Sequence, residues 1–202
     1  SENHGGGVKI MTYAQPRFDN CTIADNSTEG LGGGLYVDWT AKARIYNSIL
    51  ANNRPADTYE QTAGSIITDA VYFGNPKFVT GPLGDYYLDP LSPAVNAGST
   101  TARAVALDQY TTNPSISPII LDTGVVDLGY HYENPGNLER LTLTVAVLDE
   151  QGISRGSVSF QPESQTPGLY YYGQFVDLSV SIPSGYIITG WTGGTVRDGA
   201  TD

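Results

Sequence analysis

Cysteine pairs, helical periodicity and long apolar runs are all missing from this chain of 202 residues. The single cysteine, Cys21, excludes a disulfide within the chain. No window of about 11 to 18 residues keeps apolar side chains at i, i+3, i+4 and i+7, so we expect almost no α-helix. No apolar run reaches about 18 residues and no signal-peptide pattern is present, so the sequence predicts no membrane insertion in this fragment.

Basic residues and catalytic motifs are also scarce. The chain has 10 Lys and Arg against 21 Asp and Glu, a formal net charge of -11. Nucleic acids and anionic membranes require clustered Lys and Arg, so neither is expected as a partner. His4 and His131 lie far apart without a metal-ligand spacing, which favours ordinary turn residues over a zinc or acid–base role. No nucleophile-elbow, P-loop or zinc-protease motif is present, and we expect no cofactor.

What the chain does have is glycine, tyrosine and an internal repeat. Its 24 Gly, 12 Pro and 14 Tyr favour strands and turns. The segment Gly5–Asn26 aligns without gaps on Gly32–Asn53. The matched pairs, all separated by the same spacing, are Arg17 with Arg44, Asn20 with Asn47, Ala24 with Ala51 and Asn26 with Asn53. A fixed period of about 20 to 50 residues indicates stacked structural units.

Each repeat alternates apolar and polar residues. The matched apolar positions are Val8 with Leu35, Ile10 with Val37, Phe18 with Ile45 and Ile23 with Leu50. Short strands joined by Gly and Asn corners describe one turn of a right-handed parallel β-helix, with turns about 4.8 Å apart. The Asn pairs would bond corner backbone, and the glycine triplets mark bends where a Cβ would clash or φ is positive. Cys21 takes the slot of Ser48 and is expected to be a small half-buried filler.

The residues that follow the repeats strengthen a family resemblance. The segments Asn20–Asn26 (NCTIADN), Gly32–Asp38 (GGGLYVD) and Ala43–Asn53 (ARIYNSILANN) are similar to β-helix repeats of large secreted bacterial proteins, including polymorphic-outer-membrane-type surface proteins. Gly84–Ser99 and Val126–Glu133 resemble the ending of choice-of-anchor β-helix proteins. This resemblance covers most of residues 1–134 and implies the C-terminal turns of a β-helix with their cap, in a secreted or cell-surface bacterial protein.

A second resemblance lies near the C-terminus. Tyr170–Gly194 is similar to the signature of internalin-B-type bacterial repeats, although Ser181 and Ile188 depart from it. The matching residues are Gly173, Val176, Leu178, Pro183, Gly185, Tyr186, Gly190 and Trp191. The resemblance implies a small antiparallel β-grasp-like domain. Because such repeats normally finish with another strand, we expect this domain to be truncated and the chain to be part of something longer.

The expected all-β organisation has two domains. Residues 1–134 form the β-helix turns and cap, 135–140 a linker, and 141–202 the internalin-type domain. Tyr59–Gly81 is interpreted as a degraded turn with Ile66, Ile67, Val71 and Phe78 as core candidates, and 100–123 as a loop-rich cap. Strands are predicted in the second domain at Leu141–Asp149, Gly156–Gln161, Gln174–Ile182 and Tyr186–Trp191.

Candidate functional residues are basic, aromatic and acidic. Arg17 and Arg44 should form a column on one outward face, with Asp19, Asp38 and Lys42 nearby. This column is either the base of a polysaccharide-lyase-like groove or a solvated face with offset charges. Trp39 and at least one of Tyr170, Tyr171 and Tyr172 should be exposed for sugar or protein contacts, or else pack at a rim. A structural calcium near Asp108, Asp122 or Asp127 is a further hypothesis.

Together these features favour a non-catalytic extracellular structural or adhesive protein: a β-helix rod with a stalk module, its partners being other copies or modules of the same protein, or a surface glycan or protein. Exposed strand edges also suggest filament assembly. The alternatives are a fragment of a carbohydrate-active enzyme, either a polysaccharide lyase or a glycoside hydrolase, and a glycan-binding module.

Overall fold

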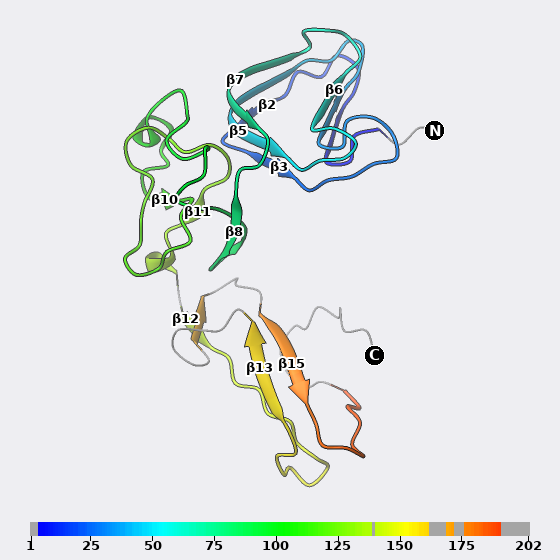
Figure 1. Ribbon diagram of the computed structural model, residues 1–202, viewed down its shortest axis with the longest axis vertical. Coiled ribbons are helices and arrows are strands. Elements are labelled where there is room, and N and C mark those ends of the chain that lie inside the picture. The colour runs from blue at the N-terminus through cyan, green and yellow to red at the C-terminus, as the bar shows by residue number, and fades with distance from the viewer. Residues whose placement is uncertain (1–3, 139, 162–168, 172–175, 191–202) are drawn as a thin grey trace. The chain divides into compact units, whose positions relative to one another are not determined.

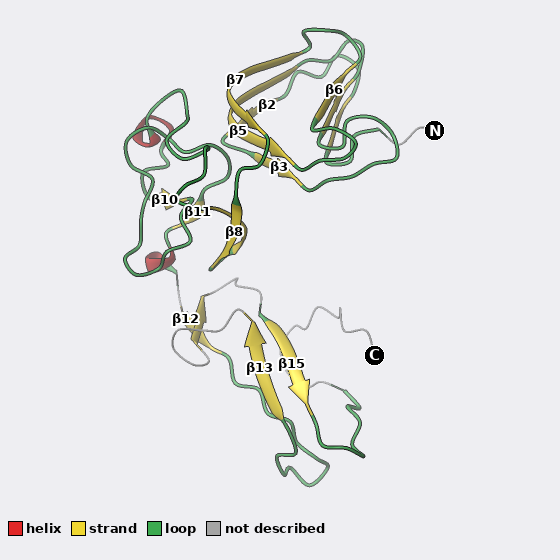
Figure 2. Cartoon of the chain, viewed as in Figure 1, coloured by secondary structure: helices red, strands yellow, loops and turns green. Residues whose placement is uncertain are grey.

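The chain is all-β, as its composition predicts. The computed structural model describes residues 4–138, 140–161, 169–171 and 176–190, with the backbone alone for residues 140 and 171. Strands provide almost all the regular structure there. The two helices of this part are short 3-10 turns, η1 (Ala102–Val105) and η2 (Pro135–Asn137), coloured red in Figure 2.

By its internal contacts the chain divides into two units. The first contains Ser1–Arg140 and Tyr171–Phe175, and the second contains Leu141–Tyr170 and Val176–Asp202. Each is described by itself below.

The first unit begins with two parallel sheets. In one, β4 (Leu35–Val37) lies between β1 (Val8–Ile10) and β6 (Thr58–Glu60). In the other, β2 (Arg17–Asp19) and β3 (Thr22–Ala24) pair with one edge of β5 (Ala43–Ala51), and β7 (Ile66–Phe73) pairs with the other edge. Figure 1 shows β2, β5 and β7 side by side.

The strand register confirms that the two repeats lie over each other. Val8 is paired with Leu35, Phe18 with Ile45 and Ile23 with Leu50, all in parallel. These are the pairs that the ungapped alignment of the sequence with itself matches. The third segment is shorter than the first two. Ile45 is paired with Phe18 on one side and with Thr68 on the other, and fewer residues separate Ile45 from Thr68 than from Phe18.

The apolar core is centred on the second repeat. Leu35, Val37, Ala43, Ile45 and Leu50 are all 0% exposed. Their neighbours at the two ends of the stack are only half-buried: Val8 and Phe18 in the first repeat, Ile66 and Val71 in the third segment. Ile67 is 42% exposed, so its predicted place in the core is wrong, because alternation along β7 turns it away from Ile66.

A relay of side-chain amides joins the corners of the stacked segments. Asn26 donates from its backbone N–H and from Nδ2 to Asn53 Oδ1, both at 3.0 Å. Asn53 in turn donates from its backbone N–H (3.0 Å) and Nδ2 (2.9 Å) to Asp57 Oδ1. Buried corner backbone is thereby satisfied, as the sequence predicts for this Asn pair. Asn20 and Asn47 adopt left-handed backbone at φ 49° and 46°, which Asn tolerates better than most residues.

The glycine triplets permit close approach of the stacked corners. A Cβ on Gly33 would overlap the backbone of Arg54, including its carbonyl oxygen. A Cβ on Gly34 would lie 2.7 Å from Asn53 Nδ2, inside the relay. The matched Gly6 would meet the carbonyl oxygens of Gly33 and Ser27 at 2.6 and 2.7 Å. Sterics therefore account for glycine at these corners.

The rest of the first unit packs beside the repeats. β8 (Phe78–Gly81) and β9 (Gly84–Leu88) form a hairpin, and β10 (Tyr110–Thr111) pairs with β11 (Tyr132–Glu133). Leu88, Ala94 and Leu128 pack against Ile49 and Ala51 of β5 in a second core. Hydrogen bonds from Ser99 to Asn47 and from the Tyr130 N–H to Thr22 bind this region, residues 76–137, to the second and first repeats. We call it the cap region; the loop-rich cap predicted at 100–123 is one part of it.

The second unit contains β13 (Ser157–Gln161), β15 (Asp177–Ser181) and all but one residue each of β12 (Arg140–Thr142) and β14 (Leu169–Tyr171), since Arg140 and Tyr171 are counted with the first unit. β13 and β15 are antiparallel, with Phe160 paired to Leu178. The predicted strand Leu141–Asp149 is wrong beyond Thr142, where the described residues make only an isolated antiparallel bridge between Leu148 and Ser154. The Asp149 carboxylate accepts the N–H groups of Gln151 and Ile153 in the turn that follows. Residues 186–190 are not in a strand either.

We expect Gly33→Ala to destabilise the first unit by about 3 kcal/mol or more, because its Cβ meets backbone that cannot rotate away. Chemical denaturation measures the change. Gly190→Ala is the control, since a Cβ there has no atom within 4 Å. Equal stability of the two variants would contradict the close stacking of the corners.

Candidate functional site

The predicted arginine column forms, but its first member is already paired. Arg17 and Arg44 are neighbours in the register of β2 and β5. Arg17 Nε and Nη2 donate to the two carboxylate oxygens of Asp19 at 2.6 and 2.7 Å, and its guanidinium lies 4.3 Å from the centre of the Tyr46 ring. The bond to Asp19 raises the pKa of Arg17 above its usual range, so Arg17 is a poor proton acceptor. The next residue in the column is Ile67, not a third base.

An exposed aromatic corner lies after β1 and β4. Tyr13 is 76% exposed, Trp39 67% and Met11 50%, and we call these three residues the aromatic corner. The backbone beneath them is fixed: the Tyr13 N–H donates to Thr40 Oγ1 at 3.0 Å, and Thr62 Oγ1 donates to the Trp39 carbonyl at 2.9 Å. The sequence predicts an exposed Trp39. Met11 and Tyr13 were not singled out from the sequence, although these residues of the first repeat correspond to Asp38 and Thr40 of the second.

The tyrosine cluster near the C-terminus contributes less than predicted. Tyr170 is only 6% exposed and packs at 6.1 Å, ring centre to ring centre, from Phe160. Its ring therefore offers no exposed platform. The side chain of Tyr171 and all of Tyr172 lie outside the described residues.

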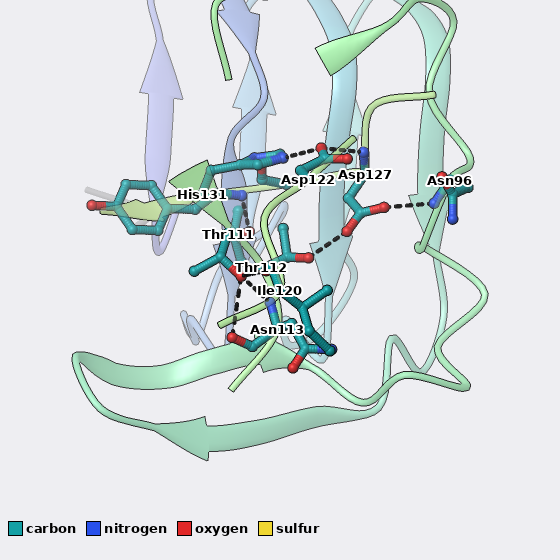
Figure 3. Close-up of polar contacts among 11 residues, drawn as sticks. Asn96, Thr111, Thr112, Asn113, Ile120, Asp122, Asp127 and His131 are labelled. Atoms are coloured by element: carbon teal, nitrogen blue, oxygen red, sulfur yellow. Dashed lines mark hydrogen bonds and ion pairs between the residues drawn. The ribbon is translucent and has the colours of Figure 1, made fainter. Parts of the chain in front are cut away.

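The densest polar constellation lies within the cap and was not foreseen as a unit (Figure 3). His131 Nε2 lies 2.7 Å from Asp122 Oδ2, and the same oxygen accepts the Asp127 N–H at 2.8 Å. Asp127 then accepts the Asn96 N–H at 2.6 Å and the Thr112 hydroxyl. We call Asp122, Asp127, His131 and Thr112 the cap cluster. It ties together segments that are distant in sequence.

Both ring nitrogens of the histidine in the cap cluster have an oxygen neighbour. His131 Nδ1 lies 3.0 Å from the Gly129 carbonyl, which can only accept. Nε2 faces a carboxylate oxygen. Both ring nitrogens of His131 thus lie within hydrogen-bond distance of oxygen atoms. His131 and Asp122 form a buried pair, in which the two side chains are 0% and 2% exposed.

Asp127 carries a second, uncompensated carboxyl group. Burial is the main cause that raises the pKa of Asp127, and the nearby Asp122 adds to it. The hydrogen bonds from Thr112 and Asn96 and the charge of His131 oppose this rise without cancelling it. Ionising Asp127 therefore costs free energy in the folded state.

The cap cluster can position backbone but is closed to substrate. An Asp–His pair is typical of acid–base chemistry, yet these side chains are sealed from solvent. Neighbouring Thr111, in the same view, donates at 2.6 Å to the Ile120 carbonyl and accepts the Asn113 N–H at 2.9 Å. Each of these groups is used to hold one loop against another.

The predicted calcium site is not assembled by these contacts. One oxygen of Asp122 and both of Asp127 already accept hydrogen bonds from the protein, and none of these bonds involves Asp108. Across the described ranges, no group of three or more His, Cys, Asp or Glu is placed to hold a metal ion. Calcium binding near Asp108, Asp122 or Asp127 stays a prediction.

His4 and Cys21 have local structural contacts. His4 Nδ1 accepts the Leu31 N–H at 2.8 Å, and its ring stacks on Tyr36 at 4.7 Å. Cys21 is half-buried beside Ser48, whose hydroxyl accepts the Cys21 N–H at 3.0 Å. Burial raises the pKa of the Cys21 thiol, which fits the predicted filler rather than a nucleophile.

Comparison of the chain with protein-family models, with curated proteins and with solved structures yields no match. Of the helices in the described part, none is both long and apolar enough to span a membrane.

We expect Asp127→Asn to change how stability depends on pH. Since folding raises the pKa of Asp127, its protonated form favours the folded state fully below the usual carboxyl pKa of 3.8, and this contribution is lost as pH rises through the folded-state pKa. The amide cannot ionise, so the stability of the variant relative to the wild type should increase with pH across that window.

Urea denaturation at several pH values checks this expectation, with Asp108→Asn as the control outside the cluster. A stability difference that is constant with pH, or that shrinks as pH rises, would contradict the assignment of Asp127 as a costly buried charge.

Proposed function

We propose that this chain is a non-catalytic extracellular structural or adhesive protein, in which the repeats form turns of a right-handed parallel β-helix and residues 141–202 form an internalin-type spacer. One observation carries the proposal: the matched repeats pair in parallel and in register, Arg17 with Arg44, Phe18 with Ile45 and Asp19 with Tyr46. Such stacking makes a stiff rod from backbone hydrogen bonds and apolar ladders.

Further features support this role. The corner glycines and the amide relay allow strands from successive turns to stack closely. The acidic composition, with a net charge of -11, suits a soluble surface protein. The described polar clusters are used in internal contacts, which agrees with a role in presentation or assembly. The filament remains a prediction.

An antibody raised against the purified chain should label intact source cells without permeabilisation, or should detect the chain in their culture medium. Labelling of a cytoplasmic enzyme in the same cells must stay negative. Signal from the chain only after permeabilisation would exclude an extracellular role.

The enzymatic alternative makes a different prediction. A polysaccharide lyase abstracts a proton beside a uronate and releases an unsaturated sugar. Because Arg17 is held by Asp19, we expect no unsaturated product from uronate polysaccharides, with or without calcium. Product formation by the wild type that is lost in Arg44→Ala but kept in Lys42→Ala would establish the lyase instead.

A second candidate function is glycan binding, which the aromatic corner favours. Exposed rings stack on the apolar faces of sugars, and Tyr13 and Trp39 stand on fixed backbone. On a glycan array, Trp39→Ala should weaken any wild-type signal by about tenfold. Leu91→Ala, which removes an apolar side chain that is 79% exposed, should leave it unchanged. A blank array for the wild type, or equal loss in both variants, would dispose of this candidate.

A further inference from the structure

The outer face of the second repeat carries two cations that no described residue neutralises. Ala41, Ala43 and Ile45 are buried, so alternation along the chain turns Lys42 and Arg44 outward. Lys42 is exposed and Arg44 is half-buried. Among the described residues, neither side chain makes an ion pair or a hydrogen bond. Both positive charges are therefore available to a ligand.

Comparison with the first repeat shows why Arg44 lacks a carboxylate. In the first repeat Asp19 accepts from Nε and Nη2 of Arg17. In the second repeat Tyr46 takes the place of Asp19 in the register, and the Arg17 guanidinium lies over its ring at 4.3 Å. The replacement of the acid by a ring leaves the charge of Arg44 uncompensated.

The third segment does not supply the missing carboxylate either. Arg44 is paired with the exposed Ile67 of β7. The one acid of β7, Asp69, is paired with Tyr46 and makes no ion pair with a described residue. Strands β2, β5 and β7 lie side by side (Figure 1), so these outward residues share one surface. We call Lys42, Arg44, Tyr46 and Ile67 the cationic face.

Arg44 is held on the central strand of its sheet. β5 is paired on both edges, and the Arg44 N–H donates to the Pro16 carbonyl at 3.1 Å. Its half-buried side chain has Arg17 as a neighbour on one side and Ile67 on the other. A side chain that is already confined loses less conformational freedom when it binds a ligand.

The aromatic corner adjoins the cationic face through fixed backbone. The Lys42 N–H donates to the Ala14 carbonyl at 3.0 Å, and the preceding Tyr13 donates its N–H to Thr40 Oγ1 at 3.0 Å. Trp39 lies in the same bend, and its ring is exposed. The exposed rings and the two cations therefore stand on one bend of fixed backbone.

The acids near this face limit the charge density of a ligand. Asp38 is the one acid of the bend, and its Oδ1 accepts the Trp39 N–H at 2.8 Å. The net charge of the chain is -11, but charges farther away than about 8 Å are largely screened at physiological ionic strength. A ligand with few anionic groups is attracted by Lys42 and Arg44. A densely charged polymer would also reach Asp38 and Asp69, and nucleic acid needs a longer basic patch.

From these contacts we infer that the cationic face and the aromatic corner together bind an acidic glycan that carries carboxylate groups. The planar guanidinium of Arg44 binds a carboxylate through two parallel N–H donors, and Lys42 adds a second positive charge. The Trp39 ring stacks on a sugar of the same chain. No bridging calcium ion is required. The inference rests on the glycan-binding candidate, whose ligand class it names, and not on the extracellular rod.

The test measures binding of the full chain to polygalacturonate, alginate and hyaluronan by isothermal titration calorimetry in buffer containing EDTA. Each polymer is compared with its own methyl ester, which keeps the sugar chain and removes the charge. At least one acidic polymer should bind saturably and about tenfold more tightly than its ester. Binding should weaken as salt is added, because solvent-exposed charges are screened.

Arg44→Gln should weaken this binding by about tenfold. Arg103→Gln, which removes the same charge from an exposed arginine of η1, should bind like the wild type. Arg44→Lys keeps the charge but loses the paired donors, so it should recover only part of the loss. Circular dichroism and thermal melting must show that the variants are folded. Should Arg44→Gln unfold the chain, the exposed Lys42→Gln replaces it, with an expected loss of about threefold.

Four results would overturn the inferred ligand class: equal binding of acidic polymers and esters, equal loss in Arg44→Gln and Arg103→Gln, binding only after calcium is added, or tighter binding of dextran sulfate. Ester binding that is lost in Trp39→Ala would leave the glycan-binding candidate standing without this ligand class. Absence of binding to all three acidic polymers would overturn the inference, and a blank glycan array would in addition dispose of the candidate on which it rests.

Discussion

The constraint on which this structure depends is the in-register stacking of equivalent residues. When a strand pairs with its own repeat in parallel, each side chain has its equivalent as a neighbour. Apolar pairs such as Phe18 and Ile45 gain from this arrangement, and amides such as Asn26 and Asn53 bond to one another. Arg17 and the stacked Arg44 would repel each other, but the Asp19 carboxylate and the Tyr46 ring offset the positive charge of Arg17. Stacking alone therefore accounts for the asparagine pair and for Asp19, without a role in ligand binding.

The cap region follows a different rule, in which a few buried polar side chains connect loops without regular pairing. Asp122, Asp127 and His131 join segments around residues 96, 112 and 129. Those loops in turn reach the repeats through Ser99 and Tyr130. Buried ion pairs contribute little net stability, yet removing one partner is costly. The cluster accordingly fixes one loop arrangement more than it adds to the free energy of folding.

Sequence reasoning recovered what the repeat encodes and little of what lies outside it. The pairing of Val8, Phe18 and Ile23 followed from matched positions, since the register of stacked strands is a property of sequence spacing. Ile67 was misplaced because the third segment is shorter and has no second copy to fix its phase. Leu141–Asp149 alternates like a strand, but beyond Thr142 the described residues pair only through an isolated antiparallel bridge between Leu148 and Ser154. The Asp122–His131 pair carries no local signature, because its members meet only through tertiary folding.

The carboxylate of Asp57 also bears on how such a chain can change in length. Asn53 both accepts from Asn26 and donates to Asp57, so a further copy of the repeat inserted between Asn26 and Gly32 would find a matching donor and a matching acceptor. The same repeat placed after Asp57 would meet a carboxylate oxygen, which cannot donate a hydrogen bond to it. Gene duplication can therefore lengthen the stack only on the N-terminal side of Asp57. Asp57 then marks the end of the stack at which no further repeat can be added.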